Sequence, residues 1–118
     1  MNTARVDRDG CTVFRLNGPV ELYVTDRLRS QLLDAIDGED MSRVVFNFEE
    51  VKSIDSAGLG LFIYLQFRRR DRTLFRFCRV NENVRRAFEN TRLISAFHVD
   101  ETEERSEEHT SELQSLLI

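Results

Sequence analysis

The sequence predicts an α/β domain: a mixed, mostly parallel sheet of four to five strands with helices packed on it. Strand-like runs alternate with helix-like runs along the chain, and a tight-turn signal near the start predicts a hairpin. The 118 residues are 41% hydrophobic and 32% charged, which is typical of one globular domain with a modest core. A hairpin followed by right-handed parallel strand–helix–strand units is the simplest topology.

The chain opens with the predicted hairpin. Residues 4–8 and 11–16 are short strand candidates, and Asp9-Gly10 between them is typical of a two-residue hairpin turn. Asn17-Gly18-Pro19 then ends the second strand. Because so short a turn joins the two strands, we expect them to pair antiparallel.

The next segment predicts a helix. Apolar residues at spacings of three and four form one stripe from Leu22 to Ile36. We expect Thr25 or Asp26 to cap the start of this helix and Gly38 to close its end.

Further strands and helices alternate after it. Residues 43–48 and 74–80 are rich in β-branched and aromatic side chains, which favours strands covered on both faces. Residues 57–70 are apolar on nearly every side, so we expect a helix that is mostly buried or that faces a partner. Asn81 can cap a short third helix, and residues 94–99 supply the last strand.

Composition excludes several classes of protein. The 17 basic and 21 acidic residues give a net charge of −4, which argues against a general nucleic-acid binder. No apolar signal-peptide region follows the start, and the longest apolar run, residues 59–65, is too short to span a bilayer. Cys11 and Cys78 form no CxxC pair, so we expect reduced thiols in the cytoplasm, no metal and no cofactor.

The last residues form a separate segment. Residues 105–115, Arg-Ser-Glu-Glu-His-Thr-Ser-Glu-Leu-Gln-Ser, resemble the translation of a common short-read sequencing adapter over eleven consecutive positions. We therefore expect the domain to cover residues 1–104 and residues 105–118 to be an artefactual tail. The alternative is an ordinary acidic amphipathic helix that packs on the sheet through its leucines.

The most informative stretch is residues 44–60, which reads as a strand, an acidic loop and a glycine-containing helix start. We expect Ser56 to lie at or just before the helix N-terminus, where unpaired backbone N–H groups and the helix dipole favour an anion. Gly58 and Gly60 allow another backbone or a partner to come close. From the residues alone, the plainer interpretation is that Asp55 or Ser56 is only an N-cap.

This stretch resembles the signature of a known family. Phe46-Asn-Phe-Glu-Glu-Val-Lys-Ser-Ile-Asp-Ser-Ala-Gly-Leu-Gly60 is similar to the signature of the STAS domain, in particular that of bacterial anti-sigma factor antagonists. The likeness extends over residues 6–103, and the expected order of elements agrees with that fold. Departures include Pro19 and Val20 before the first helix and Arg92 in place of a frequent glycine.

The resemblance implies a regulator of transcription and no enzyme. In that family the antagonist binds an anti-sigma factor that is also a serine kinase, which frees the sigma factor. The kinase phosphorylates the serine after the aspartate, the antagonist lets go, and a serine phosphatase resets it. Carried over, the phosphorylated residue is Ser56, and the partner-binding residues are Glu21, Asp55, Ser56, Ala57, Gly58 and Leu59. The expected protein is cytoplasmic and monomeric when free, and it contacts neither membrane nor nucleic acid.

Three alternatives stay open. Some STAS domains are subunits of transporters or sensory assemblies and carry no phosphorylation switch. Clustered arginines interleaved with Phe67, Phe75 and Phe77 are compatible with binding to single-stranded nucleic acid. Those arginines are Arg68, Arg69, Arg70, Arg72, Arg76 and Arg79, with Arg85 and Arg86 nearby. Ser56 and His98 are candidates for catalysis, but no GxSxG elbow, P-loop or dinucleotide fingerprint accompanies them.

Overall fold

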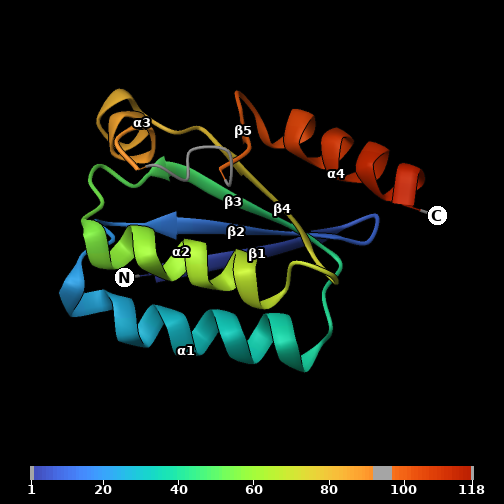
Figure 1. Ribbon diagram of the computed structural model, residues 1–118, viewed down its shortest axis with the longest axis horizontal. Coiled ribbons are helices and arrows are strands. Elements are labelled where there is room, and N and C mark those ends of the chain that lie inside the picture. The colour runs from blue at the N-terminus through green and yellow to red at the C-terminus, as the bar shows by residue number, and fades with distance from the viewer. Residues whose placement is uncertain (1, 92–96, 118) are drawn as a thin grey trace.

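A computed structural model describes residues 2–91 and 97–117 and shows a five-stranded sheet with helices on both faces (Figure 1). The elements are β1 (Asn2–Arg8), β2 (Cys11–Asn17), α1 (Leu22–Gly38), β3 (Arg43–Glu50), α2 (Ser56–Arg68), β4 (Leu74–Cys78), α3 (Glu82–Glu89), β5 (Val99–Asp100) and α4 (Glu103–Leu117). The spatial order of the strands is β1-β2-β3-β4-β5. β1 and β2 pair antiparallel and all later neighbours pair parallel, which confirms the predicted fold class.

The hairpin turn has the predicted geometry. Arg8 pairs with Cys11, so Asp9 and Gly10 are the two turn residues. Both have positive φ, 52° and 78°, as a turn that continues the twist of the strands requires. A glycine or a short polar side chain tolerates this conformation, which explains the dipeptide.

An aromatic core fills the sheet face beneath α1, α2 and α3. Phe46, in the central strand β3, is completely buried, and its ring centroid lies 5.0 Å from that of Phe62 on α2. The rings of Phe14 and Phe77 on the two flanking strands lie 5.9 and 5.5 Å from it. α3 adds Phe88, which packs on Phe77 at 5.6 Å. These rings hold three helices on one face and thereby fix the position of the α2 start.

The opposite face of the sheet has a much smaller apolar cluster. Its buried members are Cys11, Val13, Val45 and Cys78, with Val6 packed at the edge. Both cysteines are free thiols, and burial raises their pKa values, that of Cys78 to about 12. They are therefore uncharged and behave as small apolar residues beneath α4.

Charged side chains attach α4 to this second face. Arg15 of β2 donates from Nε to Glu103 Oε1 at 2.7 Å, and Asn47 of β3 donates to the same oxygen at 2.8 Å. Arg8 of β1 reaches the next turn of the helix and donates to Glu107 at 2.7 Å. The hydrogen bond from Arg15, helped by those from Asn47 and by the charge of Arg8, lowers the pKa of Glu103 to about 2.

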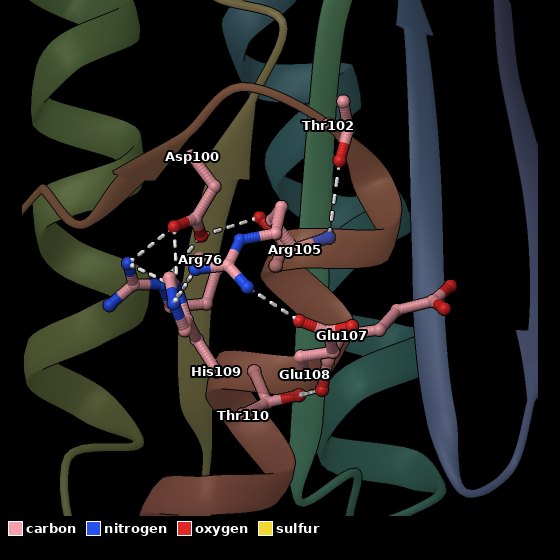
Figure 2. Close-up of polar contacts among 9 residues, drawn as sticks. Arg76, Asp100, Thr102, Arg105, Glu107, Glu108, His109 and Thr110 are labelled. Carbon is pink, nitrogen blue, oxygen red and sulfur yellow. Dashed lines mark hydrogen bonds and ion pairs between the residues drawn. The ribbon is translucent and has the colours of Figure 1, made fainter.

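A second group of polar contacts joins α4 to β4 and β5 (Figure 2). Arg76 donates to both carboxylate oxygens of Asp100 at 2.8 Å, which is a bidentate pair. Ser106 donates to the same carboxylate at 2.7 Å, and the ring of His109 contacts it. Burial opposes ionisation of Asp100, but the bonds from Arg76 and Ser106 prevail and hold its pKa below the ordinary value.

The C-terminal part of the chain differs in detail from the expectation. β5 covers only Val99–Asp100; of the strand expected over residues 94–99, residues 94–96 lie outside the described residues. α4 continues without a break across residue 104, so the expected domain boundary falls within a helix. Its early residues Ser106 and Thr110 are fully buried.

The expected cap at the start of α1 is wrong, whereas the helix ends at Gly38, as expected. Its N-cap residue is Glu21, and Thr25 lies inside the first turn, where its hydroxyl donates to the Glu21 carbonyl at 2.9 Å. Asp26 also lies within the helix and caps nothing. Gly38 is the last helical residue, and Asp40 takes the left-handed conformation at φ 47°. The local signals misplaced the start because a distant side chain caps this helix, as described below.

The structure describes residues 2–91 and 97–117. None of the helices described there is long and apolar enough to cross a membrane. No group of three or more His, Cys, Asp or Glu side chains in those ranges is placed to hold a metal ion.

We predict that Glu103 makes the free energy of unfolding depend on pH in the acid range. Its pKa is about 2 in the folded chain against 4.5 as the ordinary value, so its contribution is complete above pH 4.5 and is lost as the pH falls towards 2. Glu103→Gln should lower the urea midpoint at neutral pH and flatten its decline in acid. The control variant is Glu104→Gln, which changes the exposed neighbouring residue. An acid dependence that is unchanged in Glu103→Gln would contradict this assignment.

Candidate functional site

One carboxylate caps two helices at the Asp55-Ser56 pair. Asp55 is the N-cap residue of α2, and its Oδ1 accepts a hydrogen bond from the Gly58 amide at 3.0 Å. Its Oδ2 accepts from the amide of Leu22, the first residue of α1, at 2.9 Å. The starts of α1 and α2 therefore meet at one end of the molecule (Figure 1).

The electrostatics of this end favour an anion. The free amides and dipoles of two helices converge on a single carboxylate. The Gly58 amide, against a smaller opposing effect of burial and with the help of the Leu22 amide, lowers the pKa of Asp55 below its ordinary value. Ser56 is the first residue of α2 and is exposed, so its hydroxyl is accessible beside these amides.

Backbone hydrogen bonds make the surroundings of Ser56 rigid. The Val20 amide donates to the Ser53 carbonyl at 3.0 Å, and the Asp55 amide donates to the Val20 carbonyl at 3.2 Å. Val20 and Ile54 thereby form an isolated parallel bridge. The loop before α1 and the loop before α2 are thus joined into one short ladder.

Gly58 is required by packing inside the protein. A Cβ atom at this position would lie 2.5 Å from the carbonyl oxygen of Val20 and 2.7 Å from Cγ1 of Ile54. No other residue lets α2 start so close to the bridged loop. The sequence predicted that Gly58 and Gly60 let another backbone or a partner come close; the Val20 backbone does so at Gly58, whereas Gly60 has open space around it.

The structure brings the expected site residues together at this end of the sheet. Glu21 is exposed and accepts a weak hydrogen bond from the Ser53 hydroxyl at 3.4 Å. Ala57 and Leu59 are half-buried on the first turn of α2. Of the expected site residues, Glu21 and Ser56 therefore contribute most to the surface at the two helix starts, and Ala57 and Leu59 contribute less.

Sequence reasoning missed two residues of this surface. Leu22 was assigned to the apolar stripe of α1, but its side chain is 67% exposed, and that of Tyr23 is 98% exposed. The buried stripe consists of Thr25, Leu28, Leu32 and Ile36. Leu22 lies two steps of three residues before Leu28, so its spacing fits the stripe and did not reveal its exposure.

The arginine cluster does not form one nucleic-acid surface. Arg69 is buried and pairs with Asp40 at 2.6 Å, whereas Arg76 lies on the sheet face under α4. Phe75 and Phe77 are buried in the core, so they offer no exposed rings on which bases could stack. The pattern of alternating arginine and phenylalanine is that of a strand covered on both faces.

Among residues 2–91 and 97–117, Ser56 has no hydrogen-bonded base of the kind that activates a nucleophile. Within the described part of the chain, no hydrogen bond joins Ser56 to a histidine, and backbone amides occupy both oxygens of Asp55. His98 lies beside β4, where its carbonyl accepts from the Phe77 amide at 2.8 Å. An activated serine needs a base within hydrogen-bond reach, and none is placed here among those residues.

The chain belongs to the STAS domain family, whose model matches residues 2–106. An anti-sigma factor antagonist from Mycobacterium paratuberculosis has a similar structure, with a TM-score of 0.84 and 20% identity over 93% of each chain. SpoIIAA of Bacillus, an anti-sigma factor antagonist, gives 0.75 in its unphosphorylated form, with 19% identity over 93% of this chain and 96% of that one. A sulfate transporter family protein from Wolinella succinogenes gives 0.77, with 22% identity over 93% and 92%. At these identities the likeness establishes the fold.

We predict that Asp55 stabilises both helix starts. Asp55→Ala should lower the free energy of unfolding by about 2 kcal/mol, since one N-cap is worth about 1 kcal/mol and two are lost. Asp55→Asn keeps one acceptor oxygen and should lose about half of that. Urea unfolding measures the difference, with the exposed Asp26→Ala as control. Equal stability of Asp55→Ala and Asp26→Ala would contradict the double cap.

Proposed function

We propose that this protein is an anti-sigma factor antagonist switched off by phosphorylation of Ser56. It binds an anti-sigma factor that is a serine kinase, and this binding releases the sigma factor and regulates transcription. The observation that carries the proposal is the exposed Ser56 hydroxyl at a double helix start capped by Asp55. A serine phosphatase restores the active form, and the protein works in the cytoplasm as a monomer when free.

The switch is a charge placed on a docking surface. The kinase transfers the γ-phosphoryl group of ATP to the Ser56 oxygen; ADP leaves, and the hydroxyl proton goes to a base of the kinase. The phosphate adds about −1.5 to −2 charges at neutral pH. The two helix starts stabilise this charge on the protein itself, so the fold does not change. In the docked complex the same charge would lose its water, and because this desolvation costs free energy, the partner dissociates.

The proposed contact residues are those named from the family resemblance: Glu21, Asp55, Ser56, Ala57, Gly58 and Leu59. Their common location at the starts of α1 and α2 supports this set. Within it, Asp55 and Gly58 act by holding the two loops and the helix start in place. Glu21 and Ser56 are the exposed members.

A second candidate function is a STAS subunit of a transporter or sensory assembly without a phosphorylation switch. The observation that favours it is the structural likeness to the sulfate transporter family protein. In that case the same surface binds its partner stably and Ser56 stays unmodified.

We also propose that the STAS domain is residues 1–104 and that residues 105–118 derive from a sequencing adapter. Residues Ser106 and Thr110 support this, because α4 turns fully buried hydroxyls towards a sheet that a covering helix normally meets with apolar side chains. Amplifying the gene from genomic DNA and reading past codon 104 by an adapter-free method tests it. We expect a different sequence there; the same codons would show that the tail is native.

We predict that Ser56 accepts a single phosphate. The full chain is mixed with the anti-sigma kinase encoded beside its gene, ATP and magnesium, and its intact mass is followed. Wild type and the control Ser53→Ala should gain one phosphate, whereas Ser56→Ala should gain none and stay bound. Ser56→Asp should bind weakly, because it carries a charge at the same place.

The outcomes separate the two candidate functions. Stable binding without modification would favour the structural subunit. Phosphate on Ser56→Ala, or unaltered binding by Ser56→Asp, would contradict the assignment of the switch to Ser56.

A further inference from the structure

Leu22 and Tyr23 are exposed side chains on the first turn of α1, where the Leu22 amide is bonded to Asp55, the residue before Ser56; we call this pair of residues the α1 anchor. Tyr23 is 98% exposed and Leu22 is 67% exposed. Tyr23 has no hydrogen bond, ion pair or ring contact with any other described residue. A large aromatic side chain that does nothing for its own fold is a candidate for binding, because tyrosine is enriched among the residues that dominate interface energies.

The backbone of the α1 anchor is held firmly before any partner arrives. The Leu22 amide donates to Asp55 at 2.9 Å. The amides of Val24 and Thr25 donate to the Glu21 carbonyl at 2.9 and 3.1 Å. A side chain on so fixed a backbone loses little conformational freedom on binding, so more of the energy of its burial contributes to affinity.

We propose that the α1 anchor inserts into an apolar pocket of the serine kinase that phosphorylates Ser56. This inference rests on the proposed function. The Asp55 carboxylate joins the Leu22 amide to the Gly58 amide, two residues after Ser56. A protein that brings ATP to the Ser56 hydroxyl therefore covers the start of α1 as well.

Charge specifies the chemistry of the pocket further. Glu21, directly before the anchor, is exposed and makes no ion pair with another described residue. The complementary surface is an apolar slot for the Tyr23 ring with a cationic side chain at its rim for Glu21. A phosphate on Ser56 adds a second, strongly hydrated charge next to the buried anchor, which opposes closure of the slot.

The other exposed aromatic residues of the helix layer serve as internal controls. Tyr64 and Phe67 are 42% and 65% exposed, and each already contacts an arginine, Arg29 at 5.8 Å and Arg70 at 4.3 Å from the ring centroid. Phe67 lies eleven residues after Ser56 on α2, which is about 16 Å along the helix axis. A partner docked at the helix starts does not need to reach it.

The test measures binding of the full, unphosphorylated chain to the purified anti-sigma kinase encoded beside its gene, by titration calorimetry with ADP present. Tyr23→Ala should raise Kd about tenfold or more. Tyr23→Phe should bind nearly as wild type, because the ring is kept, and Phe67→Ala should change Kd by less than about twofold. Urea midpoints of all variants should agree, because none of these side chains is buried.

Each other outcome overturns the proposal in a recognisable way. If Tyr23→Ala binds like wild type while wild type is phosphorylated on Ser56, the anchor is wrong and the proposed function stands. If wild type neither binds the kinase nor is phosphorylated by it, both fail. Equal losses in Tyr23→Ala and Phe67→Ala would show that the whole helix layer binds. A wild-type dimer that Tyr23→Ala dissociates would make a second copy the occupant.

Discussion

The rest of the site depends on one carboxylate that accepts hydrogen bonds from the starts of two helices. Asp55 binds the amide of Gly58 in its own helix and the amide of Leu22 in a helix that begins 33 residues earlier. The bridge between Val20 and Ile54 and the missing Cβ of Gly58 bring the two starts close enough for this. A site built in this way has two converging helix dipoles on a hydrogen-bonded backbone, which is compatible with the proposed switch by charge.

The two faces of the sheet are held by different forces. An apolar core with stacked and edge-on phenylalanine rings holds α1, α2 and α3. α4 lies over a small cluster of valine and cysteine and is held by polar contacts to four strands. Arg8 and Arg15 pair with its carboxylates, Arg43 donates to its Glu107 carbonyl, and Arg76 pairs with Asp100 of β5, which accepts from Ser106. Acid therefore weakens the attachment of α4 as Glu103 and Asp100 become protonated, and it weakens the two helix starts as Asp55 becomes protonated.

Family membership and the side chains of this particular chain support the proposed function in different ways. The STAS match and the fold explain the order of elements and the position of the Asp55-Ser56 pair at a helix start. They are common to antagonists and to transporter domains, as the structural neighbours illustrate. The proposed binding surface rests in addition on the exposure of particular side chains, above all Tyr23 and Leu22, which depends on this chain's own sequence.

The sequence by itself determined the features that rest on neighbouring residues. Asp9-Gly10 sets the hairpin turn, Asn81 caps α3 through a bond to the Val84 amide, and the alternation of strands and helices defines the parallel sheet. Only the tertiary structure decided that Asp55 also caps α1, that Leu22 faces solvent and that the clustered arginines divide between the two faces. Each of these depends on contacts between segments far apart in the chain, and local propensity carries no information about which distant group will satisfy a helix start or cover a side chain.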